Sequence, residues 1–251
     1  MTALVRALGA ETLKLKRTLV LWLVIIAPSI IVSVRFLEWT QHGRIFLYPG
    51  VNPWTRLTQS ILSIWSMLML PLFIILETTL LSGLEHAGEQ WKHLFALPIP
   101  RWAVYAAKQL TGLGLIGLST LVLWVEIPLA GSGLRLLKPE LDFAQQPIPW
   151  LEILRLVVLT YLTAWLIVAI HTWVSVRWSS FTLAIGIGIA ATFFGLITTS
   201  TEFGRIYPWS LPVSVVFGQG ERLPLALALS TIGSIVVGVV GSWECTHRDI
   251  L

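Results

Sequence analysis

Charged side chains are scarce in this chain of 251 residues: Asp, Glu, Lys and Arg make up only 12% of it, whereas 55% is hydrophobic. A soluble domain carries about twice that share of charge, so most of this chain is solvated by something other than water. Several apolar runs reach the roughly 20 residues that cross a bilayer as a helix. The composition therefore excludes an ordinary soluble domain and predicts an all-α, polytopic membrane protein.

Several features that define other protein classes are also absent. The single cysteine, Cys245, cannot form an intramolecular disulfide. The net charge of +4 is small and spread along the chain, which argues against the dense basic face of a nucleic-acid-binding protein. No GxxxxGK[ST] loop occurs, so the chain is not itself a P-loop ATPase. No small-residue cleavage site follows the first apolar run, which we therefore expect to remain as a membrane span.

The apolar runs predict six transmembrane helices within a single domain that covers residues 1–251. Proline lies in the middle of the first two runs, at Pro28 and Pro71, where we expect a kink or a packing defect. Gly112, Gly114 and other small residues give the third run a face that another helix could approach closely. The predicted spans are Thr18–Leu37, Leu57–Ser82, Ala103–Ala130, Leu151–Val176, Phe181–Thr201 and Leu223–Trp243.

Basic residues around the first span indicate its orientation. Four Lys or Arg residues precede it, whereas only Arg35 and Arg44 follow it closely. Positive charge flanking the first span favours the cytoplasmic side, so we expect both termini in the cytoplasm and the protein in the cell membrane. The segments predicted outside the spans are the loops Glu38–Arg56, Gly131–Trp150 and Glu202–Arg222 on the outer side and the turn Arg177–Ser180 on the inner side.

The segment before the first span predicts an amphipathic helix over residues 1–17. Its apolar side chains fall near one face and its basic side chains near the other face or the end of the helix. Such a helix lies along the headgroup boundary, with its apolar face towards the lipid. The apolar residues are Leu4, Val5, Leu8 and Leu15, and the basic ones are Arg6, Lys14, Lys16 and Arg17.

The stretch Leu84–Gln109 is the longest polar break between two strongly apolar runs on the predicted cytoplasmic side. Helix-forming residues continue to Leu97, where Pro98 and Pro100 end the helix. A new apolar run begins at Trp102. We therefore predict a short polar helix outside the membrane, continuous with the third span, on which a partner pushes. Its charged or titratable residues are Glu85, His86, Glu89, Lys92, His93, Arg101 and Lys108.

Two acidic residues fall within or at the edge of predicted spans, Glu77 in the second and Glu126 in the third. An ionised carboxylate there is costly and is expected to face a partner or a wet cavity. Each is a candidate for a substrate contact or an interhelical polar contact, and the alternative is a residue at the headgroup level. They lie at opposite depths, which argues against one shared active site.

The sequence argues against a metal site and against a nucleophilic active site. His86, Glu89 and His93 share one helical face, but no fourth ligand accompanies them, so a solvated or docking face is favoured over a zinc site. Gly131-Ser132-Gly133 lacks a histidine base nearby in the spans, which argues against a serine hydrolase. His171 is the only histidine in the spans, too few for the facing pair of a haem site.

Three stretches resemble a known family. ETLKLKRT at Glu11–Thr18, leading into an apolar span with a central proline, resembles the start of ABC-2 type transporter permeases. The stretch Glu85–Lys108, with its W-K, L-P-x-P-R and Y-x-A-K elements, is similar to the cytoplasmic segment of that family. It is most like the branch of lantibiotic and bacitracin immunity permeases. The tail His247–Ile250 is similar to the R-D that closes many members.

The resemblance implies the membrane half of an ATP-driven exporter. Two permeases, a pair of identical chains or a chain and its sister, would join two separate ATPase subunits that bind the ATP and Mg²⁺. This chain would then be no enzyme and would hold no cofactor. Its partners would be the ATPase, the second permease and membrane lipid. Residues 1–17 would form an interfacial elbow helix and residues 84–98 the coupling helix. The substrate stays open among antimicrobial peptides, antibiotics and lipid-like amphiphiles.

The resemblance also implies roles for individual residues. Trp91 and Leu94 would anchor the coupling helix in the ATPase, because large apolar side chains dominate interfaces. Charged residues beside them would set the register. Two rival hypotheses remain, a membrane-embedded enzyme that uses Glu77, Glu126 and His86 as acid and base groups, and a structural subunit of a larger complex. The expected ATPase interface comprises Glu85, His86, Glu89, Trp91, Lys92, Leu94 and Arg101.

Overall fold

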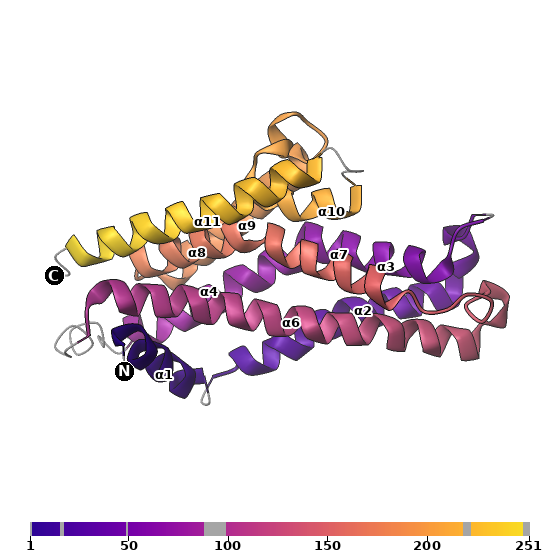
Figure 1. The fold of residues 1–251 in the computed structure, drawn as a ribbon, viewed down its shortest axis with the longest axis horizontal. Coiled ribbons are helices and arrows are strands. Elements are labelled where there is room, and N and C mark those ends of the chain that lie inside the picture. Colours follow the sequence, from indigo (N-terminus) through magenta and orange to yellow (C-terminus); the bar gives the residue numbers. More distant parts are fainter. Residues whose placement is uncertain (1, 16–17, 49, 88–98, 218–221, 248–251) are drawn as a thin grey trace.

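The computed structural model describes residues 2–15, 18–48, 50–87, 99–217 and 222–247. Over these residues the chain is helical and contains no strand. Helix α1 and the last turns of α11 lie at one end of an elongated bundle (Figure 1), which we call the terminal end. The helices are α1 (Ala3–Leu15), α2 (Val20–Phe46), α3 (Pro53–Ile64), η1 (Trp65–Met69), α4 (Leu70–Ala87), α6 (Arg101–Leu137), η2 (Pro139–Leu141), α7 (Trp150–Thr163), α8 (Trp165–Arg177), α9 (Phe181–Thr198), η3 (Phe203–Arg205), η4 (Pro208–Val213), α10 (Ser214–Phe217) and α11 (Arg222–His247).

Six helical stretches of the described chain are long and apolar enough to cross a membrane. The prediction of an all-α protein with six spans is therefore confirmed. The turn between the fourth and fifth spans also lies where it was predicted, because α8 ends at Arg177 and α9 begins at Phe181. The stretches are Val20–Phe46, Pro53–Gly83, Arg101–Leu137, Trp150–Arg177, Phe181–Thr198 and Arg222–His247.

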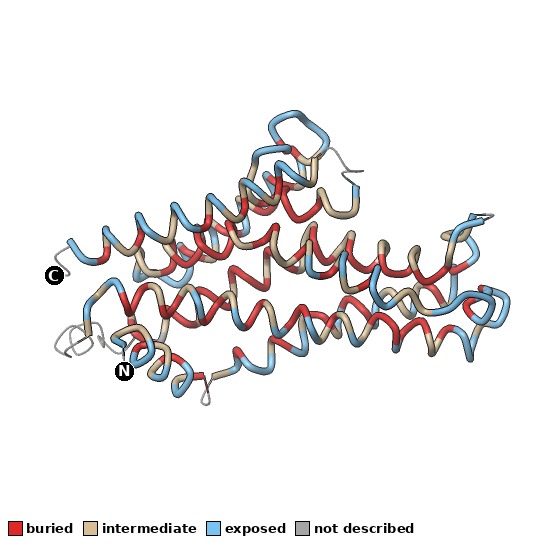
Figure 2. The backbone as a smooth tube through the Cα atoms, in the orientation of Figure 1, coloured by how far each residue is buried: buried red, intermediate tan, exposed pale blue. Residues whose placement is uncertain are grey.

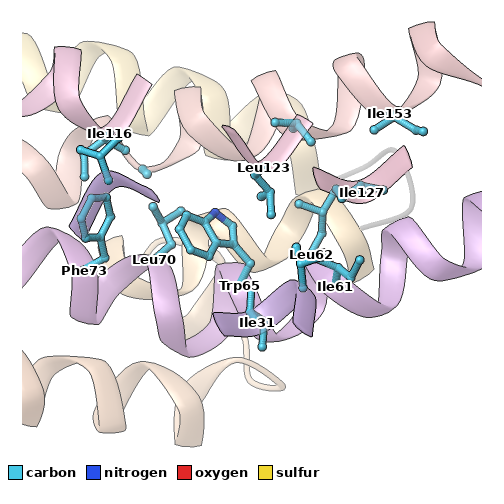
Figure 3. Packing of buried hydrophobic residues seen from close by; sticks show 14 of the residues in the cluster. Ile31, Ile61, Leu62, Trp65, Leu70, Phe73, Ile116, Leu123, Ile127 and Ile153 are labelled. Atoms are coloured by element: carbon cyan, nitrogen blue, oxygen red, sulfur yellow. The ribbon is translucent and has the colours of Figure 1, made fainter. Parts of the chain in front are cut away.

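Helix α6 is the central packing element, because α1, α2, α7, α8 and α11 all contact it. Helix α4 packs mainly on α8 and α9. Figure 2 shows buried residues on the faces that the helices turn towards one another, and exposed residues along the outer side of α11. Trp65 and Leu70 of the second span meet Ile116 and Leu123 of α6 in the core (Figure 3). The exposed outer faces are strongly apolar, as expected for helices surrounded by lipid.

The first and third spans are longer than their sequences predicted. Helix α2 continues to Phe46, although a loop was expected from Glu38. Trp39 is fully buried, stacks on Phe46 with ring centroids 5.5 Å apart, and donates its indole N–H to Ser60 at 3.2 Å. Helix α6 similarly continues to Leu137. The loop predictions were wrong here because tertiary burial of aromatic rings stabilises helix in segments that look polar.

The prolines in the first two spans act differently from expectation. Helix α2 passes through Pro28, and its one non-helical residue is His42, with φ −130° and ψ 16°. In the second span a π-helical turn, Trp65–Met69, immediately precedes Leu70 and Pro71. A π turn changes the hydrogen-bonding register, so it accommodates a residue that has no N–H to donate.

The fourth span is interrupted at Ala164, which the sequence did not predict. Helix α7 ends at Thr163 and α8 begins at Trp165. The hydroxyl of Ser230, on α11, accepts a hydrogen bond from the backbone N–H of Leu166 at 3.2 Å. The same hydroxyl donates to the carbonyl of Leu162 at 2.8 Å. One serine thus satisfies backbone groups on both sides of the break, which a lipid-embedded helix requires.

Helix α1 is confirmed as a helix, but its partner differs from the prediction. Leu4 and Leu8 pack with Ala7 against Ala103 and Ala107 of α6 rather than facing away from the protein. The small side chains of these alanines allow the two helices to approach closely. Most of the face that was predicted to contact lipid therefore contacts α6. Among the apolar side chains of α1, Val5 and Leu13 remain exposed.

Candidate functional site

Four charged side chains form a buried ion cluster at the terminal end of the bundle, and they come from three helices. Lys108 of α6 lies 2.7 Å from Glu85 Oε2 and 3.3 Å from Glu11 Oε2. Lys14 of α1 lies 2.7 Å from Glu11 Oε1 and 2.5 Å from Glu85 Oε1. Lys108 also donates to the carbonyl of Leu81 at 2.9 Å. The cluster joins α1, α4 and α6.

The charges in the ion cluster balance, with two carboxylates and two ammonium groups. Burial raises the pKa of the Glu11 carboxyl, but the charges of Lys108 and Lys14 outweigh burial and hold this pKa below its ordinary value. Burial lowers the pKa of Lys14, and the carboxylates of Glu85 and Glu11 reverse this, leaving it above its ordinary value. Both shifts favour the charged forms, so each buried charge depends on the others.

Residue spacing on α1 and the packing of α1 on α6 together bring the members of the ion cluster into contact. Glu11 and Lys14 are three residues apart on α1, which places them on one helical face. Ala103 and Ala107 bring α1 against α6, and Lys108 directly follows Ala107. A lysine buried at 2% exposure inside a membrane protein requires neutralising partners, and Glu11 and Glu85 supply them.

The ion cluster encloses the predicted coupling segment in sequence. Glu85 lies just before residues 88–98, and Lys108 lies in the third turn of the helix that follows them. The two flanks of the segment are therefore joined to each other by a direct ion pair.

The described residues of the predicted ATPase interface lie in different surroundings. Glu85 was expected to present its charge at a surface that a partner contacts. It is fully buried instead, because its carboxylate pairs with Lys108 and Lys14 in the ion cluster. The imidazole Nε2 of His86 lies 3.0 Å from the carbonyl of Ser175 on α8. Arg101 begins α6 and is half-buried. Glu89, Trp91, Lys92 and Leu94 lie outside the described residues, as does most of the coupling helix predicted at 84–98.

The first intramembrane acid, Glu77 of α4, lies deep inside the bundle with a fully buried side chain. Neither of its carboxylate oxygens has a hydrogen-bond partner among the described residues. Glu77 is two helical turns from Glu85 along α4. An acid left unpaired inside a membrane protein is costly to retain, which marks it as a candidate for function.

The second acid, Glu126 of α6, contacts the neighbouring helix α2. Ser29 of α2 lies 2.5 Å from Glu126 Oε1, whereas Glu126 Oε2 has no hydrogen-bond partner in the part of the chain that the structure describes. The pair borders a groove of about 490 Å³ lined by residues of α2 and α6, among them Phe36 and Leu129. The interhelical contact predicted for Glu126 is present. No contact joins it to Glu77, so the described structure does not assemble the two acids into one active site.

A second polar contact joins α8 to α11 at the terminal end. Arg177 Nε lies 2.9 Å from Glu244 Oε1, and the indole N–H of Trp173 donates to Glu244 Oε2 at 2.6 Å. This contact and the bond between His86 and Ser175 attach α8 to its neighbours. Sequence reasoning assigned no role to any of these contacts.

Sequence reasoning also missed Glu11, Lys14 and Lys108 as members of one cluster. One available signal was the spacing of Glu11 and Lys14 on a predicted helix. Another was a lysine, Lys108, a few residues inside a predicted span, where an unpaired charge is not tolerated. Which acids neutralise that lysine depends on the packing of α1 on α6, and the local sequence does not encode that packing.

Comparison with known proteins identifies the family. Residues 7–195 match the family described as ABC-2 family transporter protein. The matched range holds about three quarters of the chain and contains all four members of the ion cluster. No curated protein and no solved structure matches the chain. Because the match covers far more than half of its length, the chain belongs to the ABC-2 family of transporter proteins.

Proposed function

We propose that this multi-pass membrane protein is the permease subunit of an ATP-driven exporter, energised by a separate ATPase subunit. Its ABC-2 family membership makes it the membrane component of an ABC transporter. The sequence contains no P-loop of its own, so ATP and Mg²⁺ would be bound by the partner. In this proposal the protein lies in the cell membrane with both termini in the cytoplasm.

The observation that carries the proposal is the ion pair between Glu85 and Lys108, which joins the helices before and after residues 88–98. A partner that binds this segment through Trp91 and Leu94 would move α4 and α6 as one body. Because the same ion cluster includes Glu11 and Lys14, α1 would move with them. Rigid-body movement of packed helices is a common way to transmit a conformational change.

The exporter would contain two permeases and two ATPases. The sixth span is the least enclosed of the six, with 17% of its apolar stretch buried, and the first and fifth spans follow with 28% each. These faces are available to lipid and to a second permease, which would be another copy or a sister chain. Gly186 of α9 has open space around it, so another helix could approach closely there, whereas Gly188 and Gly195 pack against the protein's own side chains.

The substrate class follows from the resemblance to lantibiotic and bacitracin immunity permeases, namely an antimicrobial peptide, an antibiotic or a lipid-like amphiphile. Such a molecule has both apolar and polar parts. Glu77 offers a polar group inside the bundle and Glu126 one beside an apolar groove. We propose that one or both lie along the substrate path.

Co-purification tests the proposal. The permease is expressed with the ATPase encoded in the neighbouring reading frame and reconstituted in lipid, and bacitracin-stimulated ATP hydrolysis is measured. We expect the two chains to purify together and Trp91→Ala to weaken their association about tenfold or more, as for other interface anchors. Trp22→Ala is the matched control, because Trp22 is an exposed tryptophan on α2 outside the segment.

A permease that purifies alone and functions without any ATPase contradicts the proposal. Equal weakening by Trp22→Ala and Trp91→Ala would also count against docking at residues 88–98. The rival hypothesis of a membrane-embedded enzyme predicts turnover of a substrate without ATP, and loss of that turnover in both Glu77→Gln and Glu126→Gln.

A further inference from the structure

A pocket of about 340 Å³ lies where the fifth and sixth spans end, away from the terminal end of the bundle. Residues of η3, η4 and α10 line it, and these segments lie between α9 and α11 in the chain. Met67, from the π-helical turn of the second span, also lines it. The π turn therefore places a core helix beside a pocket at the membrane surface, and π turns are frequent at functional sites.

Two arginines give the pocket its charge. Arg222 is half-buried, and among the described residues its guanidinium has no ion pair or hydrogen bond. Arg205 lies 2.8 Å from Glu202, a pair that is largely exposed to the surroundings and therefore weak. Among the described residues, the pocket thus has one arginine without a counter-ion and a second whose counter-ion is exchangeable.

The hydroxyl groups around the pocket do not complete an anion site by themselves. Thr199 and Ser210 both donate to the carbonyl of Gly195, at 2.7 and 3.2 Å. Ser214 donates to Leu211. These bonds hold the pocket wall in place and occupy the protons of three of the four hydroxyl groups that line the pocket, the fourth being that of Ser200. The charged donors available to a ligand come from the arginines.

The rest of the pocket is apolar and adjoins the membrane. Leu211, Val213 and Phe217 line it, and Phe217 is 61% exposed. Phe203 and Ile206 nearby are also exposed. Aromatic and aliphatic side chains at the end of a span are typical of the boundary between headgroups and acyl chains. A ligand here would contact arginine at one end and hydrocarbon along its length.

We propose that this pocket binds an anionic lipid, with the phosphate headgroup on Arg222 and Arg205 and the start of an acyl chain against Phe217 and Leu211. Arginine suits a phosphate because its planar fork donates two parallel hydrogen bonds. The lipid, rather than free phosphate, is the ligand because much of the pocket is apolar and its rim lies at the span ends. Bound lipid would connect the second span, through Met67, to the fifth and sixth spans.

Native mass spectrometry of the purified permease tests this proposal without the ATPase. Phosphatidylglycerol and phosphatidylcholine are titrated separately, and we expect the anionic lipid to bind about tenfold more tightly, because only it has an uncompensated negative headgroup. The double variant Arg205→Gln/Arg222→Gln should bind both lipids about equally. Arg222→Lys should retain part of the preference. Arg135→Gln is the matched control, because Arg135 is an exposed arginine on α6 outside the pocket.

Three results would overturn the proposal. The first is an unchanged lipid preference in the double variant. The second is an equal loss in Arg135→Gln, which would show a general effect of surface charge. The third is complete displacement of phosphatidylglycerol by inorganic phosphate at millimolar concentration, which would show a small-anion site. If the double variant does not fold, Phe217→Ala provides the second measure and should weaken binding of phosphatidylglycerol while the control does not.

Discussion

The ammonium group of Lys108 lies 2.7 Å from Oε2 of Glu85, and the two residues stand on either side of residues 88–98 in the chain. This ion pair joins α4 to α6, the helices that precede and follow residues 88–98. Lys14 and Glu11 extend the contact to α1. In the proposed exporter, these ion pairs would make α1, α4 and α6 move together when the ATPase moves residues 88–98.

Removing one member of the ion cluster should destabilise the protein strongly. We expect Lys108→Met to lower the free energy of unfolding by about 3–5 kcal/mol, because it leaves two carboxylates near one remaining ammonium in a buried site. Lys138→Met is the control, since Lys138 and Glu140 form an exposed pair at 3.8 Å and its loss should cost at most about 1 kcal/mol. Thermal and denaturant unfolding in detergent measure both. Similar losses in the two variants would contradict a role for the buried cluster.

A milder change in the ion cluster should separate ATPase binding from coupling. Glu85→Gln keeps the shape of the side chain but removes the charge that faces Lys14 and Lys108. Because Glu85 is buried, we expect the ATPase to remain bound while bacitracin-stimulated hydrolysis falls severalfold. Trp91→Ala should instead lose both ATPase binding and stimulated hydrolysis. If Glu85→Gln releases the ATPase as Trp91→Ala does, then Glu85 acts at the interface rather than within the cluster.

The attachment of α1 should depend on pH only at the extremes. The pKa of the Glu11 carboxyl is lowered in the folded protein, so its contribution to stability is present above its ordinary value of 4.5 and is lost as the pH falls through the lowered value. The pKa of Lys14 is raised, so its contribution is present below 10.5 and is lost as the pH rises through the raised value. Melting temperatures of wild type and Glu11→Gln should differ at neutral pH and converge in acid. A constant difference would contradict this.

Sequence patterns predicted the fold well where one physical rule dominates. Long apolar runs must be spanning helices because lipid offers no partner for backbone groups, and all six were found. The ends of the spans were harder to predict. Trp39 and Trp54 look like loop or interface residues in sequence, yet both are buried and stabilise extra helical turns. Both rings also contact Phe143, which is distant in the chain, and periodicity does not report such contacts.

The candidate site was predicted less completely. The segment between the second and third spans was correctly identified as flanked by two helices, but Glu85 was expected at a surface. Its burial depends on α1, which docks on α6 through Ala103 and Ala107 instead of turning its apolar face to lipid. The break at Ala164 was equally invisible, because it depends on Ser230 of another helix. Such features depend on tertiary partners, and local sequence does not specify them.

Added volume should destabilise α6 at Gly131, near the end of the helix, but not at Gly114. A β-carbon at Gly131 would lie 2.3 Å from the ring of Trp54, which is buried and hydrogen-bonded to the carbonyl of Phe143 at 3.1 Å. We expect Gly131→Ala to cost about 1–3 kcal/mol through overpacking. Gly114→Ala, in the same helix with open space around it, should cost nothing. Thermal unfolding distinguishes them, and equal stability would contradict the packing of Trp54 on α6.

Substitution of Glu77 should change stability and transport in opposite directions. Its carboxyl group is buried without a hydrogen-bond partner among the described residues, so Glu77→Met should raise the free energy of unfolding by about 1–3 kcal/mol. If the carboxyl serves the substrate path, the same change should reduce bacitracin-stimulated hydrolysis. Leu81→Met, one turn further along α4, is the control and should change neither quantity much, because it conserves volume in a buried site. Stimulated hydrolysis that survives Glu77→Met while stability rises would leave Glu77 with no part in transport. A protein that instead becomes less stable would show that the carboxyl has a partner inside the bundle.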